Sequence, residues 1–305
     1  MNNPHLRRDA ALGIAFALIS AIGFSGKAIF VKLAYLSEVD AVTLLALRMA
    51  FSVPVFIGVA LWAAWRHETP LTKREHLLVI ALGIIGYYLS SLFDFLGLQY
   101  ISAGLERLIL FLYPTMTVVL LALLYRQAIV RKVQIAIALS YGGIALVFVH
   151  DAGLQGENTM LGASLVFLST LTYSLYLVGA GHAIARIGTT RFTSYAMIIA
   201  SLACVLQFLF THPTHIALEL PARVYWLALA MAAFSTVLPV FMLSWAIRHI
   251  GTGNASLVSS LGPASTIFMA WLFLGEHVTL LQIIGSILVL AGVLVVSLHS
   301  RKGSV

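Results

Sequence analysis

The chain has 305 residues, of which 61% are hydrophobic and only 10% are charged, and its mean hydropathy is +1.00. Water-soluble domains carry about 25% charged residues, so this composition excludes a soluble globular protein and predicts one embedded in a lipid bilayer. The net charge of +7 does not indicate nucleic-acid binding, because the basic residues gather in short loops between apolar runs. The single cysteine, Cys204, excludes a disulfide framework and a thiolate metal cluster.

Ten apolar segments have roughly the 20 residues that a helix needs to cross the hydrocarbon. The first lies near the N-terminus, and because no small-residue cleavage site ends it early, we expect a retained span and not a signal peptide. The sequence therefore predicts an all-α membrane protein with ten transmembrane helices. Their approximate bounds are 10–34, 41–64, 76–99, 102–125, 132–150, 160–184, 191–211, 222–247, 253–275 and 279–299.

Five charged residues lie at least four residues from either end of their segments: Lys27, Arg48, Asp94, Glu106 and Arg107. With a rise of about 1.5 Å per residue, each lies roughly 6–11 Å below the same membrane boundary, so they are predicted to form one charged layer. A charge at the middle of a span costs about 2.5–3.5 kcal/mol, and these side chains must therefore be paired or face water. We expect Asp94 and Arg107, which flank a short turn, to form a structural ion pair.

The charged layer predicts the chemistry of a bound solute. Three cations and two anions leave one positive charge over, which suits a carboxylate held by Lys27 or Arg48, while Glu106 or Asp94 is available to an amine. For Lys27 the alternative is that its side chain snorkels to the interface. Aromatic residues on the same helix faces extend the set. The predicted substrate-binding residues are Lys27, Arg48, Tyr87, Asp94, Glu106, Tyr113, Tyr173, Tyr176 and Trp245.

Prolines and small residues predict features of the helix packing. Pro114 and Pro263 are expected to kink their helices. Gly and Ala positions in the fifth and tenth spans predict close-packing surfaces, which could also form a homodimer interface. The residues concerned are Gly142, Gly143, Ala291 and Gly292.

The sequence contains no motif for metal binding, ATP binding or catalysis. The histidines are scattered over loops and helix ends, no Walker A sequence occurs, and no nucleophile faces a base within a span. We therefore expect no cofactor, no bound metal and no enzymatic activity.

The two halves of the chain resemble each other. A shift of 149 positions places LGIAFALISAIGFSG, from Leu12, over LGASLVFLSTLTYSL, from Leu161, and it also places Pro114 on Pro263. Residues 1–150 and 151–305 are thus predicted to be two repeats of five spans each. Five is odd, so the repeats enter the membrane from opposite sides, as in secondary transporters. Lys and Arg cluster on the side of the N-terminus, which predicts cytoplasmic termini.

Two stretches carry a family resemblance. FLGLQYISAGLERLILFLYPTMTVVLLALLY and its partner WAIRHIGTGNASLVSSLGPASTIFMAWLFLGEHV resemble the EamA family of the drug/metabolite transporter superfamily. The resemblance covers essentially the whole chain and implies ten helices around a central cavity that carries amino acids or other small metabolites out of the cell. The chain departs from the pattern at Glu106 and Arg107, where small or polar residues are usual.

These observations predict a bacterial-type inner-membrane exporter of amino acids or similar metabolites that works by alternating access. Its partners would be the small solute, the lipid bilayer and a coupling proton on Glu106 or Asp94. Three alternatives stay open: a non-transporting scaffold or sensor, an intramembrane enzyme, and a transporter of another solute class, such as an organic anion or a drug-like cation.

Overall fold

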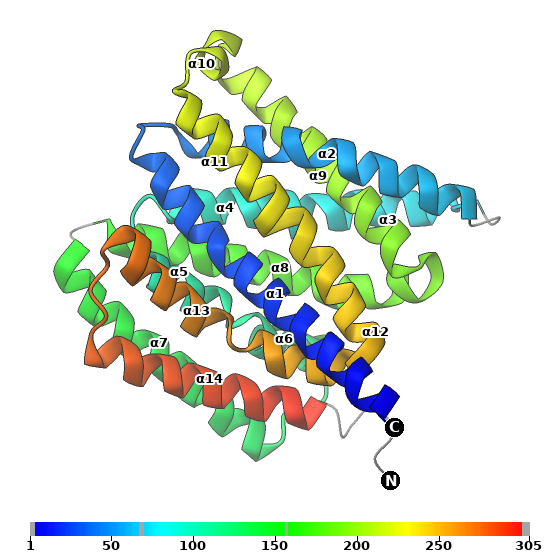
Figure 1. Ribbon diagram of the computed structural model, residues 1–305. Helices are drawn as coiled ribbons and strands as arrows, with labels where there is room; N and C mark the ends of the chain where they lie inside the picture. The colour runs from blue at the N-terminus through cyan, green and yellow to red at the C-terminus, as the bar shows by residue number, and fades with distance from the viewer. Residues whose placement is uncertain (1–3, 67–69, 156–157, 301–305) are drawn as a thin grey trace.

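The computed structural model describes residues 4–66, 70–155 and 158–300, and within these ranges the regular secondary structure is entirely helical (Figure 1). Its elements are α1 (Pro4–Tyr35), α2 (Ala41–Arg66), α3 (Lys73–Gly83), η1 (Ile84–Leu89), α4 (Ser90–Gly97), α5 (Ala103–Leu110), α6 (Tyr113–Leu124), α7 (Arg131–Gln155), α8 (Thr159–Ile187), α9 (Thr189–Thr211), α10 (Thr214–Leu218), α11 (Ala222–Ala232), η2 (Ala233–Val237), α12 (Leu238–Ser259), α13 (Gly262–Met269), η3 (Ala270–Leu274) and α14 (Leu280–Ser300).

Each predicted span falls on one helical stretch of the structure, and some of these stretches comprise two or three of the elements. Eight apolar helical stretches in the described residues are long enough to cross a membrane, and two shorter ones, Gly262–Leu274 and Leu280–Val296, complete the ten. The start of α1 and the end of α14 lie at the same end of the bundle (Figure 1). We call the opposite end, where α1 ends and α2 begins, the far end.

The helices pair in a pattern that two inverted copies produce. The first span of each repeat packs against the third span of the other, as α1 with α12 and α4 with α8. The remaining spans pack on their own counterparts, as α2 with α9, α5 with α13 and α7 with α14. The predicted architecture of two inverted five-helix repeats is confirmed.

Identical residues in the two first spans make equivalent contacts with the other repeat. Ser25 donates a hydrogen bond to the carbonyl of Gly262 (2.8 Å), and Ser174 donates one to the carbonyl of Tyr113 (3.2 Å). Since Ser25 matches Ser174 and Tyr113 matches Gly262 in the shift of 149, these are one contact made twice.

A second pair of serines repeats this arrangement. Ser20 donates to the carbonyl of Pro239 (2.9 Å), and Ser169 donates to the carbonyl of Ser90 (2.7 Å). Both pairs of positions are again 149 residues apart. The two serines that match between the repeats therefore donate hydrogen bonds across the repeats, and these bonds satisfy carbonyl groups inside the bundle.

The repeats also share their helix irregularities. The π-helical segments η1 and η2 begin at Ile84 and Ala233, which are 149 residues apart. The fourth and ninth spans are interrupted just before the tyrosine or glycine that precedes the predicted kink prolines, so that Pro114 and Pro263 stand in the first turn of α6 and α13. Proline suits that position because its missing N–H would have no partner in a first turn.

Close packing of small residues joins α7 to α14 along one edge of the bundle (Figure 1). A Cβ atom on Gly143 would lie 2.7 Å from the carbonyl oxygen of Gly285, and one on Gly292 would lie 2.3 Å from that of Ala136. Of the four predicted close-packing residues, Gly143 and Gly292 are therefore packed within one chain, whereas Gly142 and Ala291 are exposed. The predicted homodimer interface stays a prediction.

This packing generates a stability prediction. We expect Gly285→Val to lower the free energy of unfolding by about 1–3 kcal/mol, because a Cβ atom there would lie 2.6 Å from the Gly143 carbonyl oxygen. Gly142→Val is the matched control, since a Cβ atom there has nothing within 4 Å. Unfolding of the two purified variants in detergent checks this. Equal loss of stability in both would contradict the assigned packing.

Candidate substrate site

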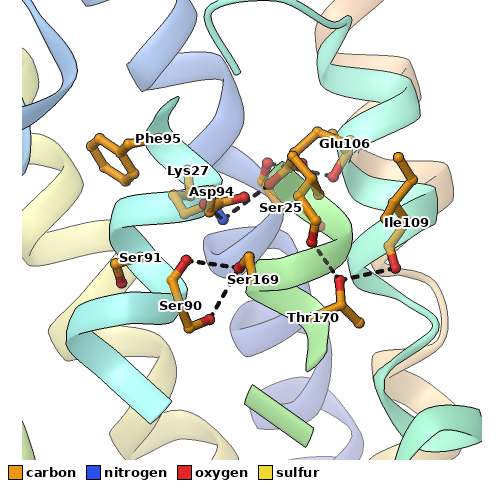
Figure 2. A network of polar contacts seen from close by, with 12 residues as sticks. Ser25, Lys27, Ser90, Ser91, Asp94, Phe95, Glu106, Ile109, Ser169 and Thr170 are labelled. Carbon is orange, nitrogen blue, oxygen red and sulfur yellow. Dashed lines mark hydrogen bonds and ion pairs between the residues drawn. The ribbon is translucent and has the colours of Figure 1, made fainter. Parts of the chain in front are cut away.

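Three ionisable side chains from three helices meet inside the bundle (Figure 2). The ammonium group of Lys27, on α1, forms ion pairs with the carboxylates of Asp94, on α4, and Glu106, on α5, and its Nζ lies 3.0 Å from Glu106 Oε1. Glu106 is completely buried and Asp94 is 3% exposed. We call these residues the carboxylate–lysine cluster. Their contact agrees with the common depth that the sequence predicted for them.

The cluster has unused acceptor capacity. Asp94 Oδ1 and Glu106 Oε2 are buried, and neither accepts a hydrogen bond from the part of the chain that the structure describes. With one cation for two carboxylates, the cluster as ionised groups carries a net charge of −1. An additional proton or a second cation would complete it electrostatically.

The predicted ion pair between Asp94 and Arg107 is wrong. Asp94 pairs with Lys27, and no carboxylate within 4.0 Å of the Arg107 guanidinium appears among the described residues. The guanidinium instead lies beside Gly262, where a Cβ atom would come 2.7 Å from Nη2. The two residues do lie near each other along the chain, but their side chains turn toward different helices.

Within the charged layer, Arg48 also has no carboxylate partner in the described ranges. Its side chain is buried, its Nη2 donates a hydrogen bond to Ser91 (3.0 Å), and its guanidinium lies over the Phe95 ring, 4.7 Å from the centroid. Its Nε has no hydrogen-bond partner. Arg48 therefore lies in a largely apolar contact between helices and makes no ion pair in the described residues.

Four of the predicted aromatic residues form one cluster. The Tyr87 and Tyr176 hydroxyl groups are 3.0 Å apart, the Tyr173 and Tyr176 rings stack at 5.6 Å, and the Tyr113 and Tyr173 rings meet edge to face at 5.5 Å. The rings come from both repeats. Gly86, in the π-helical segment η1, makes room for Tyr176, because a Cβ atom there would lie 2.2 Å from the ring.

Trp245 does not join this cluster. It is 44% exposed, and its ring packs against Phe16 on α1 at 5.6 Å. Phe16 precedes Lys27 by about 16 Å along the helix axis at 1.5 Å per residue. The prediction that Trp245 binds the substrate therefore has no support in its contacts, and the residue lies closer to the end of the bundle that holds the termini.

Serines and threonines that the sequence analysis did not assign to the site surround the charged residues (Figure 2). The Ser90 and Ser169 hydroxyl groups are 3.1 Å apart, and Thr170 donates to the carbonyl of Ile109 at 3.2 Å. The equal positions of Ser20 and Ser169 and of Ser25 and Ser174 in the two repeats were the available signal for such contacts.

Comparison with known proteins identifies the family. The EamA-like transporter family matches residues 11–149 and 160–298, which are most of the chain. The chain belongs to the EamA-like transporter family. Its two matched stretches fall on the two helical repeats.

Relatives of this EamA protein are named as transporters. The uncharacterized transporter YcbK of Bacillus subtilis is 32% identical over 91% of this chain and 90% of its own. The uncharacterized transporter YyaM of the same organism is 27% identical over 83% of each chain. A WAT1-related protein of Arabidopsis thaliana is 23% identical over 89% of this chain and 81% of its own. A solved crystal structure that is 18% identical superimposes with a TM-score of 0.63, covers 96% of this chain and 99% of the other, and shows the same fold.

The helix that carries Glu106 is held in place at the far end by both repeats of this EamA protein. Glu276, between η3 and α14, accepts hydrogen bonds from the backbone N–H groups of Ala103 (2.9 Å) and Gly104 (3.4 Å) in the first turn of α5. Ser102 caps the same turn through Leu105 N (3.0 Å) and donates to the buried Asp151 (2.7 Å). A carboxylate is favourable there because the first N–H groups of a helix have no partner within the helix.

Removing the cap should destabilise the protein. We expect Glu276→Ala to lower the free energy of unfolding by about 0.5–2 kcal/mol, the range for loss of a helix cap. Glu219→Ala removes an exposed carboxylate without an ion pair in the described ranges and serves as the control. Thermal unfolding in detergent provides the measurement, and an unchanged melting temperature for Glu276→Ala would contradict the role of this cap.

Proposed function

We propose that this protein is an inner-membrane secondary transporter that exports amino acids or similar small zwitterions by alternating access. Membership of a transporter family and the two inverted repeats support transport between the repeats. The excess of Lys and Arg at the end that holds both termini supports cytoplasmic termini. In that orientation the far end faces outward.

The observation that carries the solute class is the distribution of charge inside the bundle. Two buried carboxylates share the single ammonium group of Lys27, while Arg48 and Arg107 have no carboxylate partner in the described residues. A zwitterion matches both parts, since its ammonium group suits the carboxylates and its carboxylate suits a guanidinium. Because Lys27 is already engaged by two carboxylates, the guanidinium groups are the better partners for the substrate anion.

A proton is the coupling ion that the cluster suggests. Asp94 and Glu106 are close enough to share Lys27, and one of them can take up a proton when the substrate amine leaves. Proton entry would then drive export of the solute.

A drug-like organic cation is the second candidate. The free oxygen atoms of Asp94 and Glu106 and the clustered tyrosine rings favour it, because organic cations bind both carboxylates and aromatic faces. Such a solute has no carboxylate that could pair with Arg48 or Arg107, which is why we place it second. Uptake of tetraphenylphosphonium with no uptake of any amino acid would reverse this order.

Transport measurements test the function directly. Everted vesicles that contain the protein should accumulate at least one of the 20 labelled L-amino acids above the level of vesicles that lack it. Glu106→Gln should reduce that uptake at least tenfold, because the amide leaves the substrate amine without its buried anionic partner. Glu219→Gln, a change at an exposed position, should transport normally. Uptake by Glu106→Gln at the wild-type rate and equal protein level would remove the cluster from the mechanism.

Collapse of the pH gradient tests the coupling proton. In the same everted vesicles, nigericin with potassium should reduce amino-acid uptake several-fold, because substrate entry into an acidic lumen would depend on proton exit. Valinomycin, which collapses the electrical potential, is the comparison. If uptake continues unchanged without a pH gradient, neither Asp94 nor Glu106 carries a coupling proton, although the protein still transports.

A further inference from the structure

We propose that the guanidinium group of Arg107 binds the carboxylate of the transported solute, at the point where the interrupted helices of the two repeats meet. This inference rests on the proposed function for the amine end of the solute. It assigns a role to a residue that the sequence analysis placed in a structural ion pair.

The position of Arg107 is the first observation. It lies on α5, shortly before the interruption that precedes Tyr113, and its guanidinium lies against Gly262 at the start of α13. Tyr113 and Gly262 occupy equal places in the two repeats. The guanidinium of one repeat therefore reaches the helix interruption of the other, which is where transporters with broken helices place their substrate sites.

The unused hydrogen-bond donor of this guanidinium is the second observation. Its side chain makes no ion pair in the described residues, and its Nε is buried without a hydrogen-bond partner. Arginine stays charged in proteins, so this guanidinium is available to bind an anion directly. The guanidinium fork matches a carboxylate with two parallel hydrogen bonds.

The surroundings favour an anion. The helices α6 and α13 both begin beside this region, and a helix N-terminus carries a partial positive charge. Glu106, the neighbour of Arg107 in sequence, points about 100° away around the helix and is engaged by Lys27. Its carboxylate is therefore directed to a different face of α5.

Arg107 and the carboxylate–lysine cluster lie at a similar depth in the bundle. Ser25 donates its hydrogen bond to the carbonyl of Gly262, the residue against which Arg107 rests, and Lys27 follows Ser25 by two residues, about 3 Å along the axis of α1. Glu106 and Arg107 are also adjacent on α5. An α-amino acid, which carries its amine and its carboxylate on one carbon atom, is therefore the zwitterion that we expect to bridge the two.

Arg48 is the less suitable partner. It already donates to Ser91 and stacks on Phe95, and it is only 5% exposed in the contact between α2, α4 and α9. Arg107 is more exposed, and its guanidinium neither forms an ion pair nor lies over an aromatic ring in the described residues. The anion subsite is therefore assigned to Arg107.

Ligand-induced thermal stabilisation of the purified protein in detergent tests this assignment. The probes are the 20 L-amino acids, their methyl esters, which keep the amine but lose the anion, and simple monocarboxylates, which have no amine. The wild-type protein should be stabilised by at least one amino acid and not by its ester. Arg107→Gln should weaken the affinity for that amino acid at least tenfold and abolish the preference over the ester.

Further variants keep the test decisive if Arg107→Gln folds poorly. Gly262→Ala retains the arginine but places a Cβ atom 2.7 Å from the present position of Nη2, so the guanidinium has to shift and the preference for the acid should weaken. Arg107→Lys should give an intermediate effect, because it keeps the charge without the planar fork. Arg223→Gln, a change at an exposed position, is the control and should bind like the wild type.

The outcomes separate the two proposals. If an amino acid binds the wild type and Arg107→Gln, or Arg107→Lys where the glutamine variant does not fold, keeps the full preference over the ester, the anion subsite is wrong and the proposed function stands. If only monocarboxylates bind, and Arg107→Gln abolishes that binding, the subsite is correct and the zwitterion is wrong. If no compound with a carboxylate stabilises the wild type, both are overturned.

Discussion

The burial of ionised side chains in a bilayer is the constraint on which the site depends. An unpaired charge at mid-membrane is costly, and a pair that loses one member leaves the other exposed to that cost. Lys27 meets this constraint for Asp94 and Glu106 together, and it does so only if α1, α4 and α5 converge. The charged cluster is therefore also a packing requirement for the first repeat.

The two repeats share their helical scaffold but not their ionised residues. Ser25 and Ser174 make equivalent hydrogen bonds, and the π-helical segments and helix interruptions recur at equal positions. The ionised residues of the cluster occur in the first repeat, whereas their register partners are uncharged: Tyr176, Leu243 and Ala255. Duplication thus provided two similar halves, and one half supplied the charged groups. Contacts that hold the backbone together had to be kept in both halves, because each carbonyl inside a bilayer needs a partner.

The interrupted helices connect scaffold and site. A continuous helix would satisfy its own backbone and would present only side chains to the centre. The interruptions before Pro114 and Pro263 instead bring helix ends into the bundle, and Gly262 leaves room there for the guanidinium of Arg107. Serines of the opposite repeat donate hydrogen bonds to the carbonyl groups of Gly262 and Tyr113 at these interruptions. These bonds satisfy backbone groups at the places where the helix is irregular.

The sequence by itself determined the ten spans, the two inverted repeats, the residues that carry charge and their common depth, because hydrophobic length and a fixed rise per residue set positions along a helix axis. Only the tertiary structure decided the partners: Asp94 meets Lys27 and not Arg107, and Trp245 packs on Phe16 away from the tyrosine cluster. The reason is that rotation about the axis and the choice of neighbouring helix depend on how all the spans pack together, which no local spacing encodes.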